Sequence, residues 1–188
     1  MTAPGTAERV VRAARAAFAA NGYGGASMRT IAADVGVTAM ALYNYAPSKA
    51  ALLQLVFDET MTEVYGSLRQ AVAGKESMVE EVHAILERSG EILRNDPDLL
   101  RFLIRVVLDR QQEQLNDLEL LAPPIVAFFD ELIERAVSRR ELARRDGPRL
   151  ATFVTMLLWG IIALAASDPK SISRAVETAK WAASGRLA

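Results

Sequence analysis

One glutamate–histidine pair has the spacing of a known helical metal site. Glu80 precedes His83, the one histidine of the chain, in a Glu-x-x-His arrangement, which di-iron helical bundles use twice together with further carboxylates. The sequence holds one such pair. Nucleophilic catalysis needs a base beside a serine or threonine, and no dedicated base is evident besides His83. The chain also lacks cysteine, so we expect no metal, no cofactor and no enzymatic activity.

Charge is distributed unevenly along the chain, although its formal net charge is only −1. Residues 1–49 carry five basic and two acidic side chains, a net charge of +3, whereas the remainder carries −4. A basic region attracts polyanions through its local field, whatever the average over the chain. The basic N-terminal region is therefore the candidate for contact with a polyanionic partner.

Apolar residues recur at three- and four-residue steps, as in amphipathic helices. Val10, Ala14 and Phe18 form such a stripe, and no run alternates apolar and polar residues long enough to indicate a sheet. Ser27 begins a second helix that Gly36 ends, and Thr38 begins a short third one. A helix, a tight glycine-centred turn and another helix are typical of a helix-turn-helix.

Caps, glycines and prolines divide the chain into nine expected helices. We expect an all-α fold with helices at about 7–21, 28–35, 39–45, 49–72, 78–95, 97–116, 123–140, 147–167 and 172–183. Ser77 and Glu80 have the spacing of a capping box at the start of the fifth helix.

Residues 22–53 read GYGGASMRTIAADVGVTAMALYNYAPSKAALL. In this stretch the chain closely resembles the DNA-binding domain of TetR-family transcriptional regulators. The shared features are Gly22-Tyr23, Ser27, Ile31-Ala32, Gly36-Val37-Thr38, Leu42-Tyr43, Ser48-Lys49 and Leu52. The resemblance implies a helix-turn-helix DNA-binding domain over residues 1–48 and a helical bundle for effector binding and dimerisation over residues 49–188. It also implies a cytoplasmic homodimer that binds double-stranded operator DNA.

The same resemblance assigns roles to residues around the turn. Tyr43 and Lys49 are expected to bind phosphate oxygens, together with Ser27 and Thr38 at their helix starts. The Arg29 guanidinium suits the two acceptors of guanine, Asn44 can read bases, and Ala39 and Met40 can contact thymine methyl groups. The alternative is a three-helix packing motif that binds nothing, with the tyrosines in its core.

Two positions depart from the usual family pattern. Met40 stands where glycine or proline is common, and Ala46 stands where a larger apolar residue is usual. Met40 is expected to add a groove contact or to fill space, and Ala46 to loosen the packing beneath the third helix. The operator sequence therefore cannot be read from the family pattern.

Apolar residues of the later helices are candidates for lining a small-molecule cavity, as in the family. Apolar residues at helical spacing are also what a close-packed core needs, and His83 could be a polar core residue or an effector partner. The candidate effector residues are Met61, His83, Leu86, Phe102, Val106, Phe128 and Phe129.

Residues 150–166 form a charge-free run, LATFVTMLLWGIIALAA. This run is at the lower limit for a transmembrane helix, contains two threonines and lacks flanking aromatic residues. A dimer interface explains it better, so we expect no membrane contact. The division between the chain's own core and its partner stays open for the candidates, which are Met156, Trp159, Gly160, Ile161, Leu164, Val176 and Trp181.

The sequence thus predicts a TetR-like transcriptional repressor, released from a near-palindromic operator by an unknown small apolar ligand. Two alternatives stay open. One is a DNA-binding regulator without a small-molecule effector. The other is a helical-bundle enzyme or small-molecule carrier, which would show turnover or ligand binding without salt-sensitive affinity for DNA.

Overall fold

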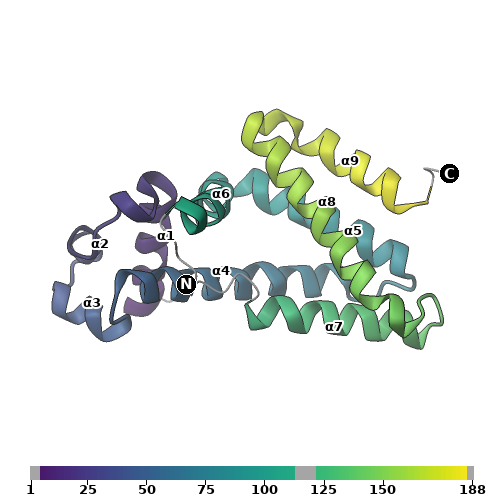
Figure 1. Cartoon of the computed structure of the whole chain (residues 1–188), viewed down its shortest axis with the longest axis horizontal. Coiled ribbons are helices and arrows are strands. Elements are labelled where there is room, and N and C mark those ends of the chain that lie inside the picture. The colour runs from purple at the N-terminus through teal and green to yellow at the C-terminus, as the bar shows by residue number, and fades with distance from the viewer. Residues whose placement is uncertain (1–4, 113–121, 186–188) are drawn as a thin grey trace. The chain divides into compact units, whose positions relative to one another are not determined.

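A computed structural model describes residues 5–112 and 122–185 of the chain, all of whose regular elements are helices (Figure 1). The described residues form nine α-helices and two short 3-10 helices, as the all-α prediction required. The 3-10 helices are Arg144–Asp146 and Pro169–Ser171. The α-helices are α1 Thr6–Gly25, α2 Met28–Val35, α3 Ala39–Tyr45, α4 Lys49–Val72, α5 Met78–Asn95, α6 Pro97–Gln112, α7 Pro123–Ser138, α8 Gly147–Ser167 and α9 Ile172–Ala183.

The predicted helix ends agree closely with the structure where local capping signals exist. Gly22 interrupts α1 with φ +67°, so the regular helix stops near the predicted Asn21. The predicted end of α6 near Asn116 lies outside the described residues. The capping box of α5 is shifted: Ser77 accepts from the Glu80 amide, but the Glu80 carboxylate accepts from the amide of Glu76.

Contacts divide the chain into two compact units. The first contains α1, α2, α3, the part of α4 up to Thr60, and α6. Helix α1 packs along α6 and α2, and α2 packs on α3. The fully buried side chains at the centre of this unit include Val10, Phe18, Ile31, Leu42, Leu52, Val56 and Phe102.

The second unit contains the rest of α4 together with α5, α7, α8 and α9. Helix α5 packs against α9 and α8, and α8 packs against α9 and α7. Its buried side chains include Leu68, Ile85, Leu86, Phe128, Leu132, Val154, Ile161 and Val176. The predicted domain boundary after residue 48 remains a prediction.

Helix α7 ends in a left-handed turn occupied by arginine. Arg140 has φ +59°, and its amide and that of Glu141 bond to the carbonyls of Val137 and Ala136, which is the Schellman pattern that usually ends in glycine. A side chain in this conformation costs about 1 kcal/mol. We expect Arg140→Gly to raise the free energy of unfolding by about 0.5–1 kcal/mol, measured by urea denaturation. Arg140→Ala is the matched control and should give no gain.

Candidate nucleic-acid interface

The turn between α2 and α3 is fixed by backbone geometry and one side-chain cap. Gly36 has φ +75°, in the left-handed region, where a Cβ would be strained. The Val37 amide donates to the carbonyl of Ala32 over 2.9 Å. Thr38 then caps α3, because its hydroxyl accepts from the amide of Ala41 at 3.1 Å. These bonds set the position at which α3 begins.

Helix α3 has one buried face and one strongly exposed face. Leu42 is fully buried and Ala46 is 1% exposed, so both anchor the helix to the unit. A seven-residue helix is unstable alone, and this anchoring holds it in place. Met40 is 74% exposed and Tyr43 is 46% exposed, while Asn44 also faces solvent. The predicted contact residues thus lie on an accessible face, although Ala39 is half-buried.

The start of α2 presents two further candidates. Ser27 occupies the N-cap position, but its side chain makes no capping hydrogen bond. The residue is exposed, as is Arg29 in the first turn of the helix. Both side chains therefore remain accessible for contact with a duplex, and their roles there stay predictions.

Lys49 is placed differently from the other candidates. It is half-buried, and its ammonium donates to the carbonyl oxygens of Tyr23 at 2.6 Å and Ala26 at 3.2 Å. The same nitrogen lies 4.3 Å from the centre of the Tyr23 ring. In this structure, the charge predicted to bind phosphate is directed at the turn between α1 and α2.

Sequence reasoning missed two residues that hold this unit together. Asp109 of α6 is 7% exposed and accepts from the Tyr23 amide at 2.6 Å. Arg9 of α1 donates to the carbonyl of Val35 at the end of α2. An aspartate directly after the apolar run Val106-Val107-Leu108 of α6 was the available signal for Asp109. Its partner is distant in sequence and could not be read from any spacing.

The candidate effector residues are divided between the two units and are mostly close-packed. Phe102 and Val106 belong to the first unit, and the others belong to the second. In the second unit, Tyr65 and Phe128 pack edge to face with ring centres 5.2 Å apart, and Phe129 lies 5.7 Å from Phe128. Burial raises the pKa of Tyr65 to about 12, so its phenol stays neutral.

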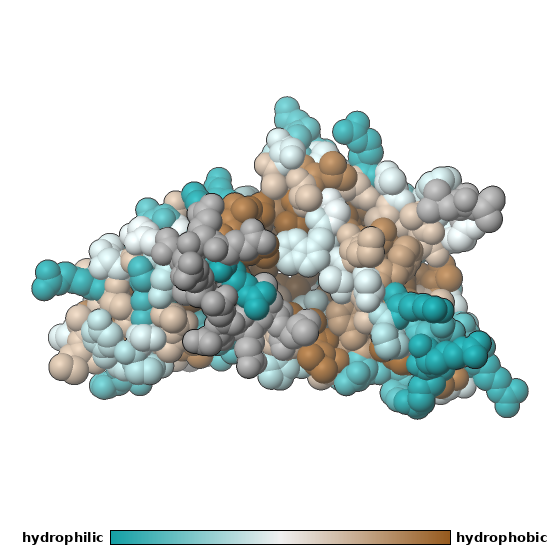
Figure 2. All heavy atoms as spheres, viewed as in Figure 1, coloured by the Kyte–Doolittle hydropathy of each residue, from teal (hydrophilic) through white to brown (hydrophobic). Residues whose placement is uncertain are grey.

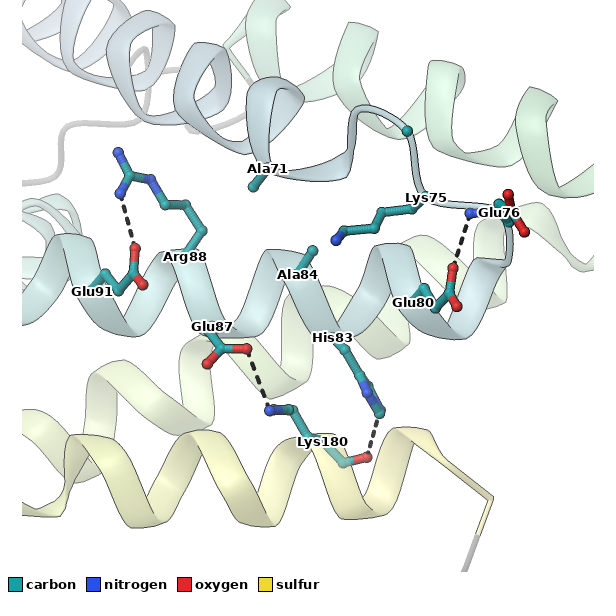
Figure 3. A pocket seen from close by; sticks show the side chains of 11 residues that line it. Ala71, Lys75, Glu76, Glu80, His83, Ala84, Glu87, Arg88, Glu91 and Lys180 are labelled. Atoms are coloured by element: carbon teal, nitrogen blue, oxygen red, sulfur yellow. Dashed lines mark hydrogen bonds and ion pairs between the residues drawn. The ribbon is translucent and has the colours of Figure 1, made fainter.

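His83 lies in a polar groove of about 600 Å³ in the second unit (Figure 3). Its Nε2 is 3.0 Å from the carbonyl oxygen of Lys180 and 3.1 Å from the Ser184 hydroxyl. The groove's carboxylates are largely engaged, since Glu87 pairs with Lys180 and Glu91 with Arg88. Such a lining suits an apolar ligand poorly. Within the described ranges, no group of three or more His, Asp or Glu side chains could hold a metal ion.

Helices α8 and α9 carry a row of apolar side chains that the described part of the chain leaves exposed. On α8, Met156 is 67% exposed, Leu164 is 52% exposed and Trp159 is 41% exposed, and Trp181 of α9 is 47% exposed. Gly160 is exposed among them. Apolar side chains reach the surface over α8 in Figure 2. We define Phe153, Met156, Trp159, Gly160 and Leu164 as the α8 face.

Two of the predicted interface residues belong to the chain's own core instead. Ile161 is 2% exposed and Val176 is 4% exposed, so neither is available to a partner in this structure. Val176 packs so closely against Gly90 of α5 that a Cβ there would lie 2.6 Å from its Cγ2. This contact fixes which side of α9 faces inward.

By length and composition alone, Arg144–Ser167 could cross a membrane, with a mean hydropathy of 2.0. Core helices of soluble proteins can be equally long and apolar, but they are mostly buried in their own chain. Here only 22% of the apolar window is buried in the chain. A large exposed apolar surface marks an interaction site, so this helix requires a partner of some kind.

Residues 10–56 match the family model described as bacterial regulatory proteins, tetR family. The nucleoid occlusion factor SlmA of Pasteurella multocida is 30% identical over 102 residues, which cover 54% of this chain and 48% of that protein. The HTH-type transcriptional repressor DrrR1 of Streptomyces coeruleorubidus is 47% identical over 53 residues, or 28% of this chain and 20% of its own length. The matched residues thus span about half of the SlmA length and a fifth of the DrrR1 length.

Solved structures resemble the fold over nearly its whole length. The fatty acid degradation regulator FadR of Bacillus halodurans has a TM-score of 0.75 at 17% identity, covering 97% of this chain and 96% of that one. The transcriptional regulator FadR of Bacillus subtilis, solved in complex with stearoyl-CoA, has a TM-score of 0.69 at 15% identity, covering 91% and 96%. At these identities the likeness shows the fold alone.

Proposed function

We propose that this chain, whose residues 10–56 match the tetR family model, is a transcriptional repressor that reads operator DNA with α3. The observation that carries the proposal is the exposed face of α3, held outward by buried Leu42 and by the Thr38 cap. In the major groove, Arg29 and Asn44 would hydrogen-bond to base edges and Met40 would contact thymine methyl groups. Tyr43 would donate to a phosphate oxygen and set the register.

Selection of bound duplexes from a random-sequence pool tests this function. We expect an enriched sequence for the unmodified protein. Arg29→Ala should relax the base preference at one position of each half-site, at a cost of about 1–3 kcal/mol. Tyr43→Ala should weaken binding to all sequences without changing the preference. Thr178→Ala, at an exposed position of α9, is the control. Absence of an enriched sequence, with binding that salt does not affect, would refute DNA reading.

A second copy of the chain is the partner we propose for the α8 face. Exposed Met156, Trp159 and Leu164 form an apolar strip along one helix, and a twofold axis lets such a strip cover its own copy. A dimer also supplies two recognition helices for a near-palindromic site. The cytoplasm, where duplex DNA is accessible, is the compartment we propose.

We further propose that a small apolar ligand binds the second unit and releases the protein from DNA. Stearoyl-CoA, present in the Bacillus subtilis structure, is the first probe because its acyl chain is apolar, and stearate is the second because it lacks the charged CoA part. Helix α4 contributes residues to both units, so displacement of its later turns by a ligand could favour a non-binding conformation. Stearoyl-CoA should then raise the melting temperature and lower affinity for the selected duplex.

A regulator without a small-molecule effector is the second candidate function. The close packing of Tyr65, Phe128 and Phe129 favours it, because a filled core leaves less room for a ligand. This candidate gains support if stearoyl-CoA and shorter acyl-CoAs leave both the melting temperature and DNA affinity unchanged.

A further inference from the structure

Both ends of α2 are held by charged side chains from other helices of the same unit. At its C-terminal end, Arg9 of α1 donates to the Val35 carbonyl. Ahead of its N-terminal end, Lys49 of α4 donates to the carbonyls of Tyr23 and Ala26. Asp109 of α6 accepts from the amide of Tyr23. Arg9 thus holds the C-terminal end of α2, while Lys49 and Asp109 hold the segment that leads into it.

Tyr23 is the centre of the contacts ahead of α2. Its amide bonds to the Asp109 carboxylate and its carbonyl to the Lys49 ammonium, each at 2.6 Å. Its ring lies under the Lys49 nitrogen and stacks on Phe18, with ring centres 6.4 Å apart. Hydrogen bonds to charged groups are about twice as strong as neutral ones, so these two bonds hold the turn firmly. We call Lys49, Tyr23 and Asp109 the Tyr23 clamp.

The turn is shaped to accept the Asp109 carboxylate. Gly22 has φ +67°, and a Cβ at that position would lie only 3.2 Å from Asp109 Oδ2. Asp109 is 7% exposed, and a buried carboxylate without partners is costly. Its bond to the Tyr23 amide therefore ties α6 to the segment that leads into α2.

The ammonium of Lys49 has little capacity left for DNA. It has three protons to donate, and three carbonyl oxygens lie within reach: Tyr23 at 2.6 Å, Ala26 at 3.2 Å and Gly24 at 3.5 Å. A phosphate contact would require breaking contacts with partners that are already in place. Arg9 differs, because it is an exposed residue with five N–H donors, one of which donates to the Val35 carbonyl.

Resting on the proposed DNA-binding function, we propose that Lys49 and Asp109 are positioning residues. They hold the segment that leads into α2, and through it α3, in the orientation that fits a duplex, and Lys49 contacts no phosphate. One of the five basic side chains in residues 1–49 is then structural. The salt dependence of DNA binding should be correspondingly smaller than the net charge of that region indicates.

The salt dependence of affinity separates positioning from phosphate contact. Each phosphate contact adds about 0.9 to the slope of log K against log salt concentration. Using the selected duplex, we expect Lys49→Met to weaken binding about tenfold at every salt concentration, with the slope unchanged. Arg29→Ala is the comparison: it should relax the base preference at one position, whereas Lys49→Met should leave the preference unchanged.

Lys49→Arg provides the sharpest comparison. Arginine binds phosphate well, so a phosphate-contacting position should tolerate it. The larger guanidinium cannot reproduce the contact with three carbonyls and the Tyr23 ring, so we expect it to weaken binding about as much as Lys49→Met. A slope reduced by about one in Lys49→Met, with affinity retained in Lys49→Arg, would overturn the proposal.

Amide hydrogen exchange tests the clamp without DNA. Asp109→Ala should speed exchange of the Tyr23 amide at least about tenfold and exchange in α2 to a lesser degree, and Asp109→Asn, which keeps an acceptor, should restore part of the protection. Unchanged exchange in Asp109→Ala would refute the clamp. If exchange changes as expected but the unmodified protein binds no duplex, the clamp stands and the DNA-binding function fails.

Discussion

Replacing both Met156 and Leu164 by glutamate is expected to convert a dimer into a monomer. The two side chains are 67% and 52% exposed in the single chain, so the substitutions leave its own core untouched. In a twofold interface each new carboxylate would be buried against apolar side chains and close to the equivalent glutamates of the second chain. Both effects are strongly unfavourable. Sedimentation equilibrium at micromolar concentration should report one chain instead of two.

The same double variant should bind the selected duplex about 100-fold more weakly or worse, because linked half-site contacts exceed single ones by about 10²–10⁴-fold. Val79→Glu is the matched control, since Val79 is an apolar residue of α5 that is 39% exposed and lies outside the α8 face. If the double variant stays dimeric, the α8 face is not the dimer interface. Binding of the unmodified protein to anionic vesicles would point to a membrane partner instead.

Glu81→Gln is expected to cause the largest loss of stability. The Glu81 carboxylate is 1% exposed and bonds to Arg135 at 2.6 Å and to Arg139 at 2.9 Å. Removing its charge leaves Arg135 without its charged partner and leaves Arg139 with Glu141 alone. Breaking a buried pair costs about 3–5 kcal/mol, and the lower end applies here because both arginines are partly exposed.

Urea denaturation measures this loss, and Glu134→Gln is the control. Glu134 also has an arginine partner, since a hydrogen bond from Arg144 lowers the pKa of its carboxyl. That pair is exposed to solvent, where an ion pair contributes little. Equal stability losses in the two variants would show that burial of Glu81 does not strengthen its ion pairs.

The helix-turn-helix could be predicted accurately because its signals are local. Thr38 caps α3 from within four residues, and Gly36 ends α2 by its own backbone conformation. These features depend on short sequence separations and on residue types with strong conformational preferences. The exposed side of α3 followed from the apolar positions that anchor it.

The environment of Lys49 could not be predicted in the same way. Its carbonyl partners lie 23 to 26 residues away, and Asp109 lies 86 residues from Tyr23. Nothing in the sequence distinguishes a lysine that faces solvent from one that caps a distant turn. Net charge alone therefore overstated the number of cations available to DNA.

The apolar run in α8 shows a different limit. A helix that is apolar on all sides indicates that more than one face is covered, but it does not say by what. Packing against α9 and α5 turns Ile161 inward and leaves Met156 and Leu164 outside. The division arises from tertiary contacts such as that of Val176 with Gly90.

Footprinting of the unmodified protein on its selected duplex tests the central claim most directly. If α3 of each chain in a dimer reads one half-site, the protected bases should form an inverted repeat whose halves are separated by whole turns of the double helix, with two chains bound per duplex. A single unpaired footprint, or uniform protection that does not depend on sequence, would contradict the claim.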